Sequence, residues 1–134
     1  MTSTLGLISH IEINVSDLSK SKEFWKYLLE ELGYTKYQDW SQGISWKLEE
    51  TYIVFVQTQE KYSDTPYHRS GTGLNHIAFY VDTKEKIDKI ALELEKNGVN
   101  LLYNDRFRKQ ITEDPYGIFF EDPDRIKVEL VISN

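Results

Sequence analysis

Apolar and polar residues alternate in two short stretches of the chain, and the two stretches match. Residues 9–17 read SHIEINVSD, and residues 75–83 read NHIAFYVDT, about half the chain later. Alternation with a period of two predicts a strand with one buried face. In both stretches a histidine begins the alternation, and the apolar positions that follow it are Ile11, Ile13, Val15, Ile77, Phe79 and Val81.

An amphipathic helical pattern follows each of these strands and ends at a glycine. The first helix has an apolar stripe before Gly33, and the second has one before Gly98, where a helix C-cap belongs. We expect Ser16 or Asp17 to cap the first helix, and Asp82 with Glu85 to form a capping box on the second. The apolar stripes comprise Phe24, Trp25, Leu28, Leu29, Leu32, Ile87, Ile90, Ala91 and Leu94.

Three short strands are predicted after each helix, so each half reads β-α-β-β-β. They cover about residues 34–40, 44–49, 52–58, 99–103, 116–121 and 126–132, and the sequence DPDR at 122–125 is expected to turn the last hairpin. The prediction is therefore a single α+β domain, residues 1–134, with modules at about 5–58 and 74–132. The polar, turn-rich segment at about 59–73 is interpreted as a surface linker.

Strand parity places three potential metal-binding side chains on the faces that do not pack on helices. His10 opposes Ile11, Ile13 and Val15, and His76 opposes the apolar set of its own strand. In the last strand Glu129 opposes Val128 and Leu130. If the two sheets curl towards each other, these faces line one cup. Two imidazoles and one carboxylate are the ligand types of a divalent transition-metal site with open positions.

Composition narrows the classes of function further. The 134 residues carry a net charge of −6, which does not favour nucleic-acid binding, and they include no cysteine. Neither a run long enough to span a membrane nor a signal peptide is apparent, so we expect a cytoplasmic protein with no membrane partner.

The duplicated histidine strands and the closing sequence EDPDRIKVEL resemble the vicinal oxygen chelate superfamily. This superfamily includes glyoxalase I, fosfomycin-resistance proteins, extradiol dioxygenases and bleomycin-resistance proteins. The resemblance implies two β-α-β-β-β modules whose curled mixed sheets surround a cup, the glyoxalase-like fold. It also implies a single divalent metal ion, Mn, Fe, Co, Ni or Zn, bound by His10, His76 and Glu129. Arg125 stands where members of the superfamily usually have glycine in the final turn.

Three functions are compatible with this resemblance. The first is a glyoxalase-like lyase or isomerase, a branch that uses a fourth ligand, for which Gln57 is the nearest candidate. The second is an enzyme of the three-ligand type, as in extradiol dioxygenases and fosfomycin-resistance proteins. The third is a metal-free protein that sequesters a small molecule, as bleomycin-resistance proteins do.

The sequence assigns no catalytic residue, but several side chains are candidates for contact with a small-molecule substrate. They are Trp46, Tyr80, Tyr103, His68 and Arg69. Because open sheets leave edges to be covered, and short members of the superfamily commonly pair, we expect a homodimer.

Overall fold

The computed structural model describes residues 3–102 and 116–133 and divides the chain into two compact units. Unit 1 is Met1–Pro66 and unit 2 is Tyr67–Asn134. The boundary falls inside the segment that was interpreted as a linker. Within the described residues, none of the helices has the length and apolar character needed to span a membrane.

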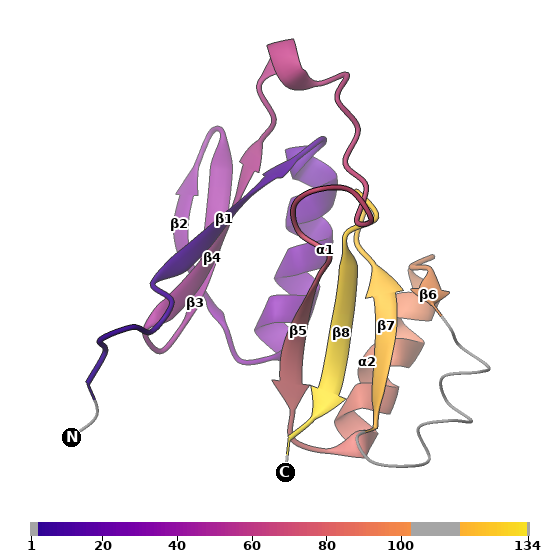
Figure 1. Ribbon diagram of the computed structural model, residues 1–134. Coiled ribbons are helices and arrows are strands. Elements are labelled where there is room, and N and C mark those ends of the chain that lie inside the picture. The colour runs from indigo at the N-terminus through magenta and orange to yellow at the C-terminus, as the bar shows by residue number, and fades with distance from the viewer. Residues whose placement is uncertain (1–2, 103–115, 134) are drawn as a thin grey trace. The chain divides into compact units, whose positions relative to one another are not determined.

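Unit 1 contains one helix and one four-stranded mixed sheet (Figure 1). The order along the chain is β1 (His10–Val15), α1 (Leu18–Glu31), β2 (Thr35–Trp40), β3 (Gly43–Leu48) and β4 (Thr51–Gln57), followed by a 3-10 turn at Glu60–Tyr62. The strand order in the sheet is β1-β4-β3-β2. β1 runs parallel to β4, and the other pairs are antiparallel.

Unit 2 repeats this arrangement and confirms the predicted α+β class. Its elements are β5 (His76–Val81), α2 (Lys84–Lys96), β6 (Leu101–Leu102), β7 (Gly117–Glu121) and β8 (Lys127–Ile132). The sheet order is β5-β8-β7-β6, again with the first strand parallel to the last (Figure 1). In both units, therefore, the histidine strand lies at an edge of its sheet, beside the final strand of the unit.

The apolar stripe of each helix packs on one face of its own sheet. In unit 1 Trp25 stacks on Phe55 with ring centroids 4.7 Å apart, and both side chains are fully buried. In unit 2 α2 lies on β5, β7 and β8 and buries Ile87, Ile90 and Ala91. Ile11 has the predicted parity but remains 38% exposed, because β1 is an edge strand.

The helix caps agree with the sequence in one unit and differ in the other. Asp17 caps α1, and its Oδ1 accepts the Lys20 N–H at 3.2 Å. The N-cap of α2 is Thr83 rather than Asp82, and its Oγ1 accepts the Lys86 N–H at 3.1 Å. A hydroxyl and a carboxylate on neighbouring residues serve this position about equally well, so sequence alone does not separate them.

The turn between β7 and β8 is built on the buried carboxylate of Asp122. Its Oδ1 accepts the backbone N–H groups of Asp124 at 2.9 Å and Ile126 at 2.8 Å. Arg125 adopts a φ of 66°, the left-handed conformation that favours glycine. A Cβ in this conformation costs roughly 1 kcal/mol, so the turn carries local backbone strain.

Arg125→Gly should therefore be more stable than Arg125→Ala. The expected difference is about 1 kcal/mol, or roughly 2–6 °C in the melting temperature, because both variants lose the contact of the Arg125 Nε with Glu121 at 3.4 Å and only glycine relieves the strain. Arg125→Ala is the matched control, since it removes the same side chain but keeps the strained Cβ. If both variants melt alike in thermal unfolding followed by circular dichroism, backbone strain is not the cause.

Candidate functional site

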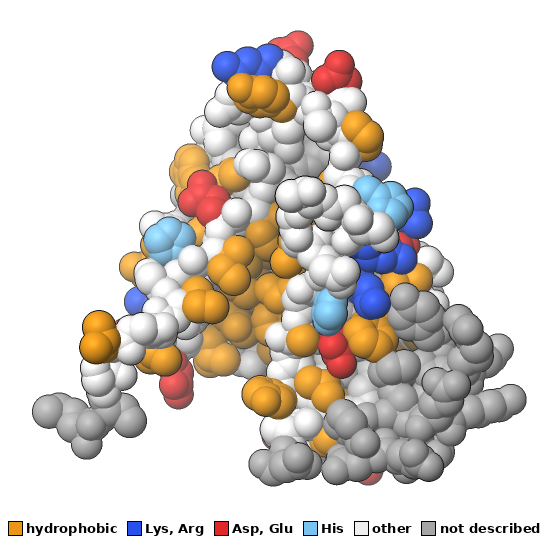
Figure 2. Space-filling view, viewed as in Figure 1, with side chains coloured by type: hydrophobic (Ala, Val, Ile, Leu, Met, Phe, Trp, Pro, Cys, Tyr) orange, Lys and Arg blue, Asp and Glu red, His pale blue; other side chains and the backbone are white. Residues whose placement is uncertain are grey.

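His76 and Glu129 lie on neighbouring parallel strands of unit 2 and face away from α2. The register opposes His76 to Lys127 and Ala78 to Glu129, so Glu129 is two residues further along the pair. The Nε2 atom of His76 is 3.3 Å from Oε1 of Glu129. Their side chains are 35% and 20% exposed, and the space-filling view shows histidine side chains at the surface (Figure 2).

The imidazole of His76 is held by its neighbours. Its Nδ1 is 2.7 Å from Oδ1 of Asn75, the preceding residue. Since an amide oxygen can only accept, Nδ1 carries the proton of this hydrogen bond. The ring also packs edge-on against Phe119, with centroids 5.9 Å apart. These contacts fix the orientation of the ring and direct Nε2 towards Glu129.

This arrangement leaves two acceptors facing each other. With the Nδ1 proton donated to Asn75, Nε2 of a neutral imidazole presents a lone pair, and the Glu129 carboxylate presents another. Two lone pairs 3.3 Å apart attract only if a positive centre lies between them, either a second proton or a metal ion. Imidazole nitrogen and carboxylate oxygen are ligands for Mn, Fe, Co, Ni and Zn, so the pair fits the divalent ion expected from the sequence.

His10 in unit 1 has a similar local arrangement. Its Nδ1 is 3.0 Å from the Oγ of Ser9, again the preceding residue. The ring stacks on Tyr52 of β4, with centroids 4.5 Å apart and an interplanar angle of 11°. The ring is thus held on its Nδ1 side and on one face. Ser9 and Asn75 were not singled out from the sequence, although a residue with a side-chain oxygen before each histidine was the available signal.

Gln57 lies on the other face of its sheet. It pairs with Val15, whose side chain packs in the core, whereas Tyr52 pairs with His10. Its Oε1 accepts the N–H of Leu18 at 2.9 Å, and its Nε2 donates to the carbonyl of Ser16 at 2.8 Å. Both ends of the amide therefore hold the backbone where β1 enters α1. This is a structural role, and Gln57 does not share the face of His10.

The position of unit 1 that corresponds to Glu129 is occupied by Val54. In unit 2 Glu129 is opposite the residue two places after His76, and in unit 1 Val54 is opposite the residue two places after His10. Val54 is 2% exposed and has no donor atom in its side chain. The register thus places a carboxylate on this face of unit 2 and an apolar side chain at the equivalent place in unit 1.

The other candidate residues differ in their surroundings. Trp46 is fully buried in the core of unit 1, where its Nε1 donates to Glu30 at 3.2 Å, so it does not line an open surface. Tyr80 is 77% exposed, on the same face of β5 as His76. His68 is exposed, and its Nδ1 accepts the N–H of Ser70 at 3.0 Å. Tyr103 lies outside the described residues.

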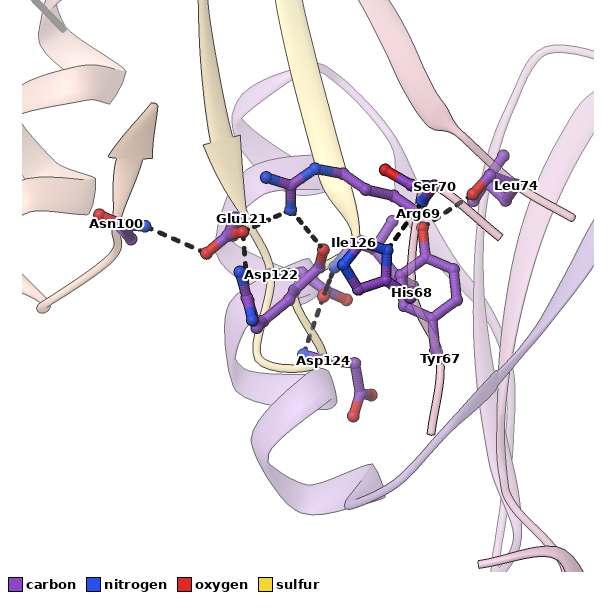
Figure 3. Close-up of polar contacts among 11 residues, drawn as sticks. Tyr67, His68, Arg69, Ser70, Leu74, Asn100, Glu121, Asp122, Asp124 and Ile126 are labelled. Carbon is purple, nitrogen blue, oxygen red and sulfur yellow. Dashed lines mark hydrogen bonds and ion pairs between the residues drawn. The ribbon is translucent and has the colours of Figure 1, made fainter. Parts of the chain in front are cut away.

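Arg69 is held within unit 2 by a buried carboxylate (Figure 3). Its Nη1 donates to Oε2 of Glu121 at 2.5 Å and to the carbonyl of Arg125 at 3.3 Å. Asn100 donates to the other oxygen of Glu121 at 3.1 Å. With its guanidinium bound to the β7–β8 turn, Arg69 is a structural residue rather than a group presented to a substrate.

The segment that leads into β5 is closed by a second contact (Figure 3). The hydroxyl of Tyr67 donates to the carbonyl of Leu74 at 2.8 Å, immediately before Asn75 and His76. This hydrogen bond joins the two ends of residues 67–74, and Arg69 on Glu121 ties the same segment to the end of β7. The chain therefore enters the histidine strand from a fixed position.

The surroundings of Glu121 also predict that the stability of the fold depends on pH. Burial acts to raise the pKa of Glu121, but hydrogen bonds from Asn100 and Arg69 and the charges of Arg125 and Arg69 outweigh it and lower that pKa. A carboxyl with a lowered folded-state pKa stabilises the fold above its unfolded pKa of about 4.3, and this stabilisation is lost as the pH falls through the folded pKa.

We expect Glu121→Gln to be less stable than the wild type at pH 7 and to lose less stability on acidification. Urea unfolding at pH 7, 5, 4 and 3 measures the free energy of unfolding of both proteins as a function of pH. Parallel curves for the two proteins over the acidic range would contradict this account of Glu121.

The variant Gln57→Glu tests whether Gln57 has a structural role or binds a metal ion. A carboxylate in place of Nε2 would face the carbonyl of Ser16, so we expect a loss of about 1–3 kcal/mol in the free energy of unfolding. Metal affinity should not change. A variant that binds a divalent ion more tightly by calorimetry, at unchanged stability, would restore Gln57 to the ligand set.

Comparison with known proteins shows the family of the chain. The family model "Glyoxalase/Bleomycin resistance protein/Dioxygenase superfamily" matches residues 7–130. The chain is 48% identical over 122 residues to "Uncharacterized protein YqjT" of Bacillus subtilis (strain 168), covering 91% of this chain and 95% of that protein. It is 28% identical over 130 residues to Glutathione transferase FosA of Serratia marcescens, covering 97% and 83%.

Solved structures give the same result. The crystal structure of a candidate glyoxalase from Bacillus halodurans superposes with a TM-score of 0.93 at 45% identity, over 97% of this chain and 98% of that one. The chain therefore belongs to the Glyoxalase/Bleomycin resistance protein/Dioxygenase superfamily.

Proposed function

We propose that this protein is a metal-dependent enzyme that acts on a small molecule bearing two neighbouring oxygen atoms. The ligands proposed for a divalent ion are those that the sequence predicts, His10, His76 and Glu129, of which the structure brings His76 and Glu129 together. A divalent ion held by these residues supplies a Lewis acid that polarises a substrate oxygen.

The observation that carries this proposal is the pair of facing acceptors in unit 2. Nε2 of His76 and Oε1 of Glu129 are 3.3 Å apart, and the other ring nitrogen is already bonded to Asn75. A metal-binding histidine commonly donates its remaining N–H to an oxygen in this way, which fixes the tautomer and the ring orientation.

The residues of unit 2 divide the work between binding and orientation. His76 provides an imidazole lone pair, and Glu129 provides a carboxylate oxygen. Asn75 keeps the proton of His76 on Nδ1, and Phe119 supports the ring from its edge. Tyr80 lies on the same face of β5 as His76 and is 77% exposed, so it is available for contact with a bound molecule.

A three-ligand chemistry is favoured over that of a four-ligand glyoxalase. Val54 stands where unit 1 would supply a second carboxylate, and the amide of Gln57 is bonded to the backbone on the opposite face. The 28% identity to a protein named Glutathione transferase FosA, over 97% of this chain, points the same way. We therefore propose transfer of a thiol or water to a small electrophile, rather than isomerisation.

Metal binding is tested by removing each proposed ligand. The wild type should melt roughly 5–15 °C higher with Mn²⁺, Co²⁺, Ni²⁺ or Zn²⁺ than with a chelator, because an ion at a hundredfold excess over Kd adds about 2.7 kcal/mol. His10→Ala, His76→Ala and Glu129→Gln should lose most of this shift while melting near the wild-type apoprotein. His68→Ala is the matched control and should keep the full shift, since His68 is outside the ligand set.

The outcome for the wild type decides between the classes of function. Elemental analysis of protein purified without added metal should find one divalent ion per chain. A wild type that responds to none of these ions, nor to Fe²⁺ under anaerobic conditions, would contradict the proposal in favour of a metal-free sequestering protein. Bound iron with O₂ uptake on a catechol would instead indicate a dioxygenase.

A further inference from the structure

Two arginine side chains meet at one carboxylate where β7 ends (Figure 3). Oε2 of Glu121 accepts Nη1 of Arg69 at 2.5 Å and lies 3.4 Å from Nε of Arg125. Asn100 donates to the other oxygen of this carboxylate at 3.1 Å, so both oxygens are engaged. Because one carboxylate balances the charge of one guanidinium, the cluster keeps a net positive charge.

Lys127 adds a third cation to this end of the sheet. It is opposite Glu121 in the register between β7 and β8, so the two side chains project from the same face. Its Nζ lies 4.5 Å from the ring centroid of Phe119, the residue two places before Glu121. In the space-filling view, Lys and Arg side chains gather over the upper part of unit 2 (Figure 2).

The other carboxylates of this region, among the residues that the structure describes, have contacts or directions of their own. Asp122 is buried, and its Oδ1 accepts two backbone N–H groups of the β7–β8 turn. The carboxylate of Asp124 points away from Glu121 (Figure 3). Glu129 faces His76 at 3.3 Å. On a chain of net charge −6, this end of the unit 2 sheet is therefore a local positive region.

The side chain of Arg125 presents this charge to solvent. It is 71% exposed, whereas the side chain of Arg69 is 22% exposed. Arg125 contacts Glu121 through Nε, so the N–H groups of its two terminal nitrogens have no acceptor within the described part of the chain. A guanidinium offers such groups as a planar fork, which matches two oxygens of a phosphate.

Arg125 also occupies a strained backbone position. Its φ of 66° is the left-handed conformation, which is unfavourable for a residue with a Cβ. Residues held in such conformations cluster at ligand-binding sites, where the strain accompanies a function of the residue. The strain and the exposed fork are separate observations, and both point to the side chain of Arg125.

We propose that the β7–β8 turn carries a binding site for the phosphate group of a small molecule, with the guanidinium of Arg125 as the main donor and Lys127 as additional positive charge. The site goes beyond the proposed function, because none of its residues is a proposed metal ligand and all of them belong to unit 2. The net charge of −6 repels an extended polyanion, so the ligand is a small phosphate monoester.

Glycerol 3-phosphate tests the site, and glycerol is its neutral analogue. Both are titrated into the intact chain and followed by ¹H–¹⁵N correlation spectra, with EDTA present so that divalent ions take no part. In about 0.05 M NaCl the phosphate should shift the backbone amide signals of the turn, residues 124–127, saturably with a Kd of about 1–10 mM, and glycerol should not. Binding should weaken severalfold in about 0.5 M NaCl.

Variants assign the binding to the fork. Arg125→Gly removes the guanidinium and relieves the backbone strain, so it should fold and bind glycerol 3-phosphate about fivefold or more weakly. Arg125→Lys keeps the charge without the fork and should have an intermediate Kd. Lys96→Gln is the matched control, because it removes one positive charge from α2, where Lys96 lies 3.8 Å from Glu93, and it should bind like the wild type.

Two results would overturn the site. One is a wild type whose turn amides show no saturable shift with glycerol 3-phosphate. The other is an Arg125→Gly variant that binds glycerol 3-phosphate as tightly as the wild type does.

Discussion

The candidate site depends on the register between the first and last strand of each unit. In unit 2 this register sets Glu129 opposite Ala78, so that its side chain projects on the same face as His76. Because the side chains of a strand alternate with a period of two, a shift of a single residue would turn Glu129 into the core and Val128 out of it. The apolar residues that pack under α2 prevent this shift, so the burial of one face fixes the chemistry of the other.

Orientation of the histidine is a separate requirement, and nearby polar contacts meet it. Asn75 holds Nδ1 of His76, and the hydroxyl of Tyr67 holds the carbonyl just before Asn75. Arg69 fixes the same segment on Glu121, a carboxylate that is only 7% exposed. Removing one partner of a pair buried to this extent is strongly unfavourable, which makes the segment a firm support. The contacts of this short loop therefore help to set the position of the His76 imidazole.

The sequence was sufficient for the fold because both halves carry the same clear alternation and helical stripe. It also placed His10, His76 and Glu129 on faces away from the helices, since parity along one strand can be counted from its apolar residues. Gln57 was harder to place, because its face depends on pairing with Val15 and on contacts with the backbone at Ser16 and Leu18. Trp46 has the size of a pocket residue, but only its contacts with Phe55 and Glu30 show that it belongs to the core.

Contacts across strands were the main feature that the sequence could not provide. Tyr37 and Tyr52 contact each other across the sheet but are far enough apart along the chain that no local pattern links them, and the irregular register of β2 could not be foreseen. The same limit applies to Arg69 and Glu121, which form an ion pair although they lie far apart in the sequence. Pairings of this kind arise from topology, whereas alternation and caps arise from neighbouring residues.

The correspondence of Val54 with Glu129 has a consequence for how the two halves of the chain diverged. Two copies of one β-α-β-β-β ancestor would each have offered a histidine and a place for a carboxylate. Unit 2 has a carboxylate at that place, while unit 1 has valine there and aromatic rings beside its histidine. Selection could then act on the two copies independently, because a substitution beside His10 leaves the pair formed by His76 and Glu129 unchanged.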